Sequence, residues 1–107
     1  IISGGSNVYP AEIDDVLLSH ASVADAAAFG AADADWGEVV HAAVTLQPGA
    51  VPGDGLAAEL LAHWAGLLPT YKRPRAVRFL DEIPRSEAGK IYRSRLRDEY
   101  GNRKIGQ

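Results

Sequence analysis

The chain contains no cysteine and no methionine, and its first lysine or arginine is Lys72. The lack of cysteine excludes a disulfide framework, a thiolate zinc site and a cysteine nucleophile. The longest apolar stretch, Ala26 to Ala32, is too short to span a bilayer, and an N-terminal third without a base is not expected to be a signal peptide. The absence of cysteine does not determine the cellular compartment, and a cytoplasmic location is the default expectation.

The remaining composition is that of an ordinary globular domain. The chain has 107 residues, of which 47% are hydrophobic and 23% are charged, so residues 1–107 should form one domain with a real core. The apolar start at Ile1 and Ile2, together with the missing methionine, predicts a piece of a longer protein.

The net charge of −3 conceals an uneven distribution. Residues 1–71 carry nine acids and no base (−9), whereas residues 72–107 carry eleven bases and five acids (+6). Either the basic third meets an anionic partner, or the two parts pack together and neutralise each other. A nucleic acid is not favoured as the partner, because the bases are not interleaved with stacking aromatics and the whole chain is acidic.

Hydrophobic spacing and turn residues predict an α+β fold, with a small sheet of short strands and about three helices packed against it. Glycine and proline clusters mark the loops between these elements. The predicted helices run from Pro10 to about His20, from Leu56 to Leu68 and around Leu96–Tyr100; the predicted strands are Val23–Phe29, Val39–Leu46 and Ala76–Leu80; the predicted loops are Ser3–Asn7, Gly30–Gly37, Pro48–Gly55 and Pro84–Lys90, with a frayed tail from Gly101.

Motifs for several kinds of chemistry are missing. His20, His41 and His63 are more than twenty residues apart, which favours solvent-facing or capping roles and no metal site. No G-x-S-x-G elbow is present. A phosphate loop ending at Gly89-Lys90 fails, because its first glycine would fall on Pro84 and Ile91 replaces the required Ser or Thr.

Lys90 is the most interesting cation for a different reason. It follows a glycine on a polar, exposed turn, and the long lysine stem can reach an anion from outside. The ordinary alternative is that Lys90 is a solvated surface lysine. By default Trp36 and Tyr71 would likewise be ordinary packing aromatics.

Five segments together resemble one family. In order they are Ile1–Ile13 (IISGGSNVYPAEI), Asp35–Glu38 (DWGE), Tyr71–Pro74 (YKRP), Asp81–Arg85 (DEIPR) and Gly89–Arg93 (GKIYR). Their order and spacing look like the C-terminal domain of adenylate-forming (AMP-binding) enzymes, which include acyl- and aryl-CoA synthetases, peptide-synthetase adenylation domains and luciferases. The resemblance covers roughly Ile1 to Tyr100, and the Trp-Gly-Glu and Gly-Lys-Ile segments look most like acyl-CoA synthetases (fatty-acid–CoA ligases).

The resemblance implies two half-reactions in one active site. A carboxylate first attacks the α-phosphate of ATP to give an acyl-adenylate, and Lys90 is the catalytic lysine that enters the site on a mobile loop. The small domain then rotates, and a different face closes the site for attack by the CoA thiol. On that face the resemblance assigns Gly4 and Gly5 to the border of the pantetheine channel, and Trp36, Tyr71 and Arg73 to the CoA nucleotide.

By the same resemblance, most of the active site lies elsewhere. An N-terminal domain with the ATP phosphate loop, the acyl pocket and any Mg²⁺ site is absent from this sequence, so the chain alone should be inactive. Two alternatives stay open at this point: a free-standing α+β binding or regulatory module, and an adenylating enzyme that loads a carrier-protein pantetheine.

Overall fold

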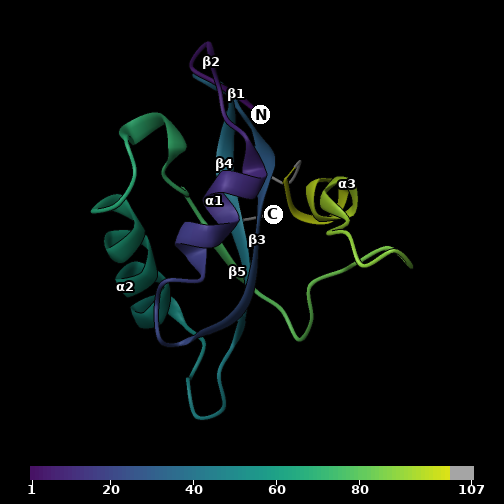
Figure 1. Cartoon of the computed structure of the whole chain (residues 1–107). Coiled ribbons are helices and arrows are strands. Elements are labelled where there is room, and N and C mark those ends of the chain that lie inside the picture. The colour runs from purple at the N-terminus through teal and green to yellow at the C-terminus, as the bar shows by residue number, and fades with distance from the viewer. Residues whose placement is uncertain (102–107) are drawn as a thin grey trace.

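The computed structural model describes residues 1–101, and residues 102–107 lie outside this description. Figure 1 shows a sheet with helices on both of its sides. The elements in chain order are β1 (Ile2–Ser3), β2 (Ser6–Asn7), α1 (Pro10–Leu17), β3 (Val23–Asp33), β4 (Gly37–Leu46), α2 (Asp54–Ala65), the 3₁₀ turn η1 (Thr70–Lys72), β5 (Val77–Phe79), α3 (Arg93–Leu96) and a final π-helical turn η2 (Arg97–Gly101).

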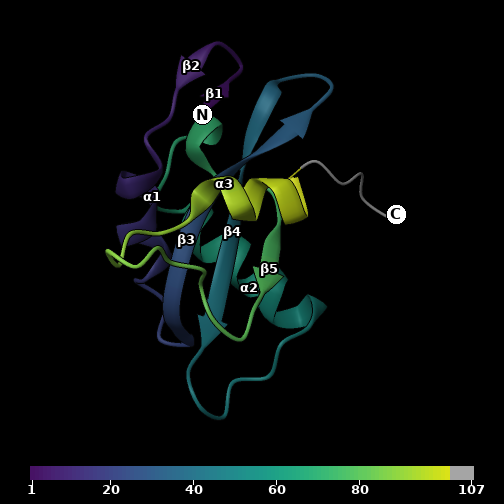
Figure 2. The same ribbon diagram turned by 90° about the vertical axis from the view of Figure 1, so that its right-hand side faces the viewer.

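Strand β4 is the centre of the five-stranded sheet, whose main path has the order β2-β1-β4-β3. It pairs antiparallel with β3 along almost its whole length and antiparallel with β1 where Ser3 meets Gly37. The short β5 pairs parallel with β4 over Ala42–Val44. The sheet is therefore largely one long hairpin, to which the N-terminal hairpin and β5 are added (Figure 2).

The two faces of the sheet are covered by different elements. Helices α1 and α2 lie on one face and α3 on the other (Figure 1). Because side chains alternate along a strand, Ala26 and Ala28 pack toward α1 and α2, whereas Ala27 and Phe29 pack toward α3. The largest buried side chains of the first cluster are Ile13, Leu17, Leu60 and Trp64, and the second cluster is completed by Ala43, Ile83 and Leu96.

Local sequence explains where α1 begins, and a contact with α2 stabilises its other end. Pro10 occupies the first turn, where its missing N–H is not needed. At the other end, the buried indole of Trp64 on α2 donates from Nε1 to the carbonyl of Leu17 at 3.3 Å. This bond satisfies a carbonyl at the end of α1 and joins the two helices.

The structure confirms the predicted fold class, and its described residues form three α-helices on a small sheet. The predicted loop over Gly30–Gly37 is wrong: β3 continues to Asp33 and β4 begins at Gly37, so that the two central strands are long. Glycine, alanine and aspartate have low strand propensity, but pairing with the β-branched strand β4 overrides that preference.

Three further features also differ from the prediction. Ser3–Asn7 forms a hairpin rather than a loop, because Gly4 and Gly5 take φ values of +57° and +84° at its tip. Helix α2 ends at Ala65, before the glycine at its C-cap, so Leu67 lies outside the helix and is exposed. Gly101 was expected to begin a frayed tail, yet it is buried, and a Cβ there would come within 2.6 Å of the Gly30 carbonyl oxygen.

Among residues 1–101, no helix combines the length and the hydropathy needed to cross a bilayer.

Candidate functional site

Lys90 lies at the end of a tight hairpin rather than in an open loop. The N–H of Gly89 donates to the carbonyl of Ser86 at 2.9 Å, and the N–H of Ser86 donates to the carbonyl of Lys90 at 2.8 Å. Gly89 has a φ of +82°, which closes the turn in the left-handed region that glycine tolerates. The Tyr92 N–H donates to the Pro84 carbonyl at 2.9 Å and closes the base of the hairpin.

Two arginines connect this part of the chain to the sheet. The Arg85 guanidinium contacts both carboxylate oxygens of Asp25 on β3, at 2.9 and 3.1 Å, and donates to the Gly89 carbonyl at 3.2 Å. Arg93, just after the hairpin, makes a two-pronged ion pair with Asp14 on α1 and donates to the carbonyl of Ala28 at 2.7 Å. The hairpin therefore has an anchor on either side of Lys90.

Lys90 itself is exposed and, within residues 1–101, makes no side-chain hydrogen bond, ion pair or cation–π contact. The other lysines and arginines of that range each contact a carboxylate, a backbone carbonyl or an aromatic ring: Lys72, Arg73, Arg75, Arg78, Arg85, Arg93, Arg95 and Arg97. Within the described residues, the hairpin thus carries an ammonium group without a partner on a hydrogen-bonded backbone.

Trp36 and Gly4 form a second group, at the turn between β3 and β4. Asp33 accepts hydrogen bonds from the N–H groups of Asp35 and Trp36 at 3.0 and 2.9 Å, which fixes this turn. The Gly4 N–H donates to the Trp36 carbonyl at 3.0 Å, and a Cβ on Gly4 would lie 2.8 Å from the indole ring. Glycine at position 4 therefore lets the N-terminal hairpin lie directly against Trp36, while Gly5 faces open space.

Arg75 completes this group and was not predicted from the sequence. Its guanidinium carbon lies 4.8 Å from the centre of the Trp36 ring, a cation–π distance, and its backbone N–H donates to the Val40 carbonyl at 2.8 Å. The available signal was the basic run after Tyr71, but Arg75 falls one residue beyond the segment that carried the family resemblance. We refer to Gly4, Trp36 and Arg75 as the Trp36 cluster.

Tyr71 and Arg73, which were predicted to share a surface with Trp36, contact other groups. Tyr71 is half-buried against the larger core cluster, and the Lys72 ammonium lies 5.7 Å from its ring centre. The Arg73 Nε donates to the Leu68 carbonyl at 2.8 Å. In the described conformation these side chains support the segment between α2 and β5.

The two groups lie in different parts of the molecule. In Figure 2, β1, β2 and the turn between β3 and β4 are at the top, whereas the green to yellow segment that carries the Lys90 hairpin extends to the left of the sheet. Figure 1 also places that segment away from β1 and β2. The Lys90 hairpin and the Trp36 cluster therefore lie on different sides of the domain.

Among the histidines, the prediction of a solvent-facing or capping role is wrong for His41. It is 8% exposed on the α3 side of β4, and its ring lies edge-on to Phe29. Its Nδ1 is buried and has no hydrogen-bond partner within the described part of the chain. Burial, and then the positive charge of Arg78, lower the pKa of His41 below its ordinary value.

The other two histidines lie near each other but do not form a metal site. His20 contacts Glu59 at 2.9 Å and His63 contacts the Ser19 hydroxyl at 2.9 Å. In the part of the chain that the structure describes, no three His, Cys, Asp or Glu side chains are arranged to hold a metal ion.

The uneven charge is partly neutralised within the fold. In the described range, four ion pairs join the basic C-terminal part to the acidic N-terminal part: Lys72–Glu12, Arg85–Asp25, Arg93–Asp14 and Arg97–Glu38. Packing between the two parts therefore accounts for part of the charge pattern without an external anion. Within residues 1–101, the bases outside these four pairs are Arg73, Arg75, Arg78, Lys90 and Arg95, and of these Lys90 alone makes no side-chain contact with a carboxylate, a carbonyl or an aromatic ring.

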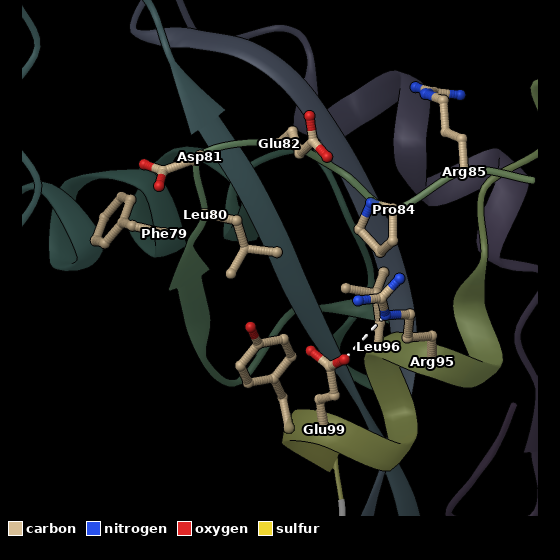
Figure 3. Close-up of a pocket in the computed structure, with 10 residues that line it drawn as sticks. Phe79, Leu80, Asp81, Glu82, Pro84, Arg85, Arg95, Leu96 and Glu99 are labelled. Atoms are coloured by element: carbon tan, nitrogen blue, oxygen red, sulfur yellow. Dashed lines mark hydrogen bonds and ion pairs between the residues drawn. The ribbon is translucent and has the colours of Figure 1, made fainter.

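A shallow pocket of about 430 Å³ lies beside α3 and the base of the hairpin (Figure 3). Apolar side chains and charged ones both line it, and Arg95 and Glu99 form an ion pair at its edge. Figure 3 shows the Arg85 side chain pointing away from that pair. Neither Lys90 nor the Trp36 cluster lines this pocket.

Comparison with known proteins gives consistent matches. The family model described as the AMP-binding enzyme C-terminal domain matches residues 12–90. A fatty acid–[acyl-carrier-protein] ligase, ScoC, from Streptomyces coeruleorubidus is 43% identical over 94% of this chain and 19% of its own length. A 2-succinylbenzoate–CoA ligase from Geobacillus kaustophilus is 45% identical over 91% of this chain and 19% of its own length.

A solved structure, the ATP-bound MatB from Rhodopseudomonas palustris, superposes with a TM-score of 0.84 at 36% identity, over 94% of this chain and 20% of that protein. The chain spans about a fifth of the length of the curated relatives that it matches. These matches confirm the resemblance that the five sequence segments indicated.

Proposed function

Because this chain belongs to the AMP-binding enzyme C-terminal domain family, we propose that it is the C-terminal domain of an ATP-dependent acyl-CoA synthetase. In this proposal a larger N-terminal domain, outside the sequence described here, holds ATP and the carboxylic acid. The small share of each relative that the chain covers supports such a partner domain.

The observation that carries the proposal is the state of Lys90. An exposed ammonium without a partner in residues 1–101, on a hydrogen-bonded hairpin, has the properties of a cation that enters a neighbouring active site. Free surface lysines are common, so it is the family membership that makes this one a catalytic candidate.

In the first half-reaction, a carboxylate oxygen attacks the α-phosphorus of ATP. The new acyl–phosphate bond forms as the bond to pyrophosphate breaks, and both reacting groups are anionic. The Lys90 ammonium would lower the repulsion between them and stabilise the negative charge on the α-phosphate oxygens. A charge that is fixed in place before the reaction is effective, because no reorganisation is needed in the transition state.

In the second half-reaction, a thiol attacks the acyl carbonyl and AMP leaves. We propose that the Trp36 cluster, with Gly5, faces the thiol substrate in this step. The indole and guanidinium groups suit stacking on adenine and pairing with phosphate, and the open space at Gly5 leaves room beside the backbone. Tyr71 and Arg73 belong to the same proposal only if they release their present contacts.

The acceptor thiol has two candidates, because the similar proteins include both kinds of ligase. The Geobacillus relative is named as a CoA ligase and the Streptomyces relative as an acyl-carrier-protein ligase. Free CoA is our first choice, and a carrier-protein pantetheine is the alternative. Thioester formation by the full-length protein with CoA and with a pantetheine-bearing carrier protein would distinguish them.

Magnesium is expected to accompany ATP, but residues 1–101 offer no cluster of ligands for it. We therefore assign no step to the metal in this domain, and any site for it would belong to the larger domain. A cytoplasmic location, as expected from the sequence, also stays a prediction.

Lys90→Ala in the full-length enzyme tests the proposal. Loss of one fixed charge contact should slow ATP–pyrophosphate exchange about 10²- to 10³-fold, while the melting temperature stays within a degree or so because the side chain is exposed and unpaired. Lys72→Ala removes the same charge and serves as the control, with its melting temperature measured because Lys72 contacts Glu12 and Tyr71. Equal slowing by the two variants would mean that general electrostatics, not a specific role of Lys90, explains the effect.

A further inference from the structure

We propose that Arg85 and Asp25 are positioning residues for Lys90. Together they form a clamp that holds the hairpin tip against β3 and thereby sets where the lysine enters the active site. This inference rests on the proposed role of Lys90 and adds two residues, 60 positions apart in the sequence, that act through it.

The clamp is a continuous chain of contacts from the sheet to the tip. Asp25 on β3 accepts from the backbone N–H of Ala26 at 2.9 Å, which orients its carboxylate. Both oxygens of that carboxylate then accept from Nη2 of Arg85, at 2.9 and 3.1 Å. The other terminal nitrogen of Arg85 donates to the carbonyl of Gly89 at 3.2 Å.

The carbonyl of Gly89 is an informative place for such a contact. It belongs to the peptide unit that joins Gly89 to Lys90, and that unit is planar and rigid. Holding the Gly89 oxygen therefore fixes the direction in which the Lys90 backbone leaves the turn. The residues at the tip, Glu87 to Lys90, are exposed, and within residues 1–101 no side chain of theirs is hydrogen-bonded to the sheet.

The exposure of the pair argues against a purely structural role. The side chains of Arg85 and Asp25 are 40% and 38% exposed, and ion pairs with that exposure contribute little to the free energy of unfolding. An arginine is suited to this task because its planar group presents several donors in fixed directions, so one side chain reaches a carboxylate and a carbonyl at once. Arg93 differs, because its pair with Asp14 is more deeply buried and joins α1 and β3 to the chain after the hairpin.

The test measures adenylation by the full-length enzyme in four variants: Arg85→Ala, Asp25→Asn, Lys90→Ala, and Arg85→Ala combined with Lys90→Ala. Misplacement of a catalytic group by about 1 Å can cost up to 10²-fold, so we expect Arg85→Ala to lower kcat about tenfold. KM for ATP should change less than twofold, because the clamp does not hold the nucleotide. Asp25→Asn should give a smaller loss in the same direction, and it provides a second variant should Arg85→Ala fold poorly.

The variant that combines Arg85→Ala with Lys90→Ala shows whether Arg85 acts through Lys90. If Arg85 acts through Lys90, Arg85→Ala should cause no further loss once Lys90 is alanine. Arg95→Ala is the matched control, because it breaks another exposed arginine–carboxylate pair, Arg95–Glu99, without touching the hairpin. It should leave kcat unchanged.

Amide hydrogen exchange on the 107-residue chain provides a readout that does not depend on catalysis. Arg85→Ala should speed the exchange of the Gly89 and Ser86 amides, which the turn protects, and leave α2 unaffected. The clamp would be overturned by any one of three results. Arg85→Ala leaves the exchange rates of the hairpin amides unchanged, or it leaves kcat at the wild-type value, or it lowers kcat tenfold equally whether residue 90 is lysine or alanine. If Lys90→Ala itself has no effect on adenylation, the proposed function fails, and the clamp fails with it; if Lys90→Ala is slow and Arg85→Ala is not, only the clamp is wrong.

Discussion

Lys90 is exposed and Trp36 is half-buried, and both rest on turns that contain a glycine with positive φ. The two regions differ in whether their functional group already has a partner. At the hairpin, the backbone is hydrogen-bonded, and the Lys90 ammonium has no partner among residues 1–101. At the cluster, the indole of Trp36 already has Arg75 over one part of it and Gly4 against another.

This difference has a consequence for the two half-reactions. A free cation on a fixed support can act as soon as it reaches its substrate. The Trp36 ring already has Arg75 at a cation–π distance, so a flat ligand that stacks on that face would displace the guanidinium. We therefore expect the hairpin to influence the rate of a chemical step, and the cluster to influence the binding of a substrate.

The largest expected effect on stability concerns the base of the hairpin. Arg93→Ala would leave the Asp14 carboxylate, whose side chain is 13% exposed, without its guanidinium partner. Removing one member of a largely buried ion pair should lower the free energy of unfolding by about 3 kcal/mol. Urea denaturation of the chain measures this, and Arg95→Ala should leave the urea midpoint in place. If Arg93→Ala unfolds at the wild-type urea concentration, the hairpin has no stable anchor and the contrast with the cluster disappears.

Gly4→Ala tests the cluster side of the comparison, with Gly5→Ala as a matched control. Both positions have positive φ, which costs a non-glycine residue about 1–2 kcal/mol. Only at position 4 would the added methyl group also meet the Trp36 ring, and such overpacking typically costs a further 1 kcal/mol or more. Denaturation midpoints should fall further for Gly4→Ala, and the indole N–H signal of Trp36 in NMR spectra should move. Identical midpoints would mean that the ring is not held against the hairpin.

A smaller effect is expected at His41, which belongs to neither region. Its pKa is lower in the folded state than the ordinary value near 6.5, so the unfolded chain binds the proton more readily. Stability should therefore be complete above about pH 6.5 and fall as the pH drops below it, with a slope of at most about 1.4 kcal/mol per pH unit from this group. Melting temperatures between pH 7.5 and 5.5 measure the trend, and His41→Phe should flatten it. An equal slope in the variant would assign the trend to other groups.

The sequence predicted those features that depend on neighbours in the chain. Pro10 marked the start of α1, the β-branched run predicted β4, and the small polar residues before Lys90 predicted an exposed turn. Strand β3 was predicted too short because its second half, from Gly30, is a strand only through its pairing with β4. The final boundary of α2 was missed because the apolar spacing continues past Gly66.

Features that depend on distant residues were not predicted. Arg85 and Asp25 are 60 positions apart, and Arg93 and Asp14 are 79 apart, so no local pattern relates them. The contact of Arg75 with Trp36 likewise requires β5 to lie beside β4. The sequence thus predicts which residues can do chemistry, and the fold is needed to see which of them are already engaged.

The most direct test of the separation between the two regions is the second half-reaction, measured alone. Full-length Lys90→Ala and Trp36→Ala would each be supplied with prepared acyl-adenylate and CoA. We predict that Lys90→Ala forms thioester within about twofold of the wild-type rate, and that Trp36→Ala needs about tenfold more CoA to reach half its maximal rate, as expected for the loss of one stacking contact of about 1.4 kcal/mol. The proposed separation of the two regions is contradicted if Lys90→Ala slows thioester formation as strongly as it slows adenylation, because the hairpin and the cluster would then act in the same step.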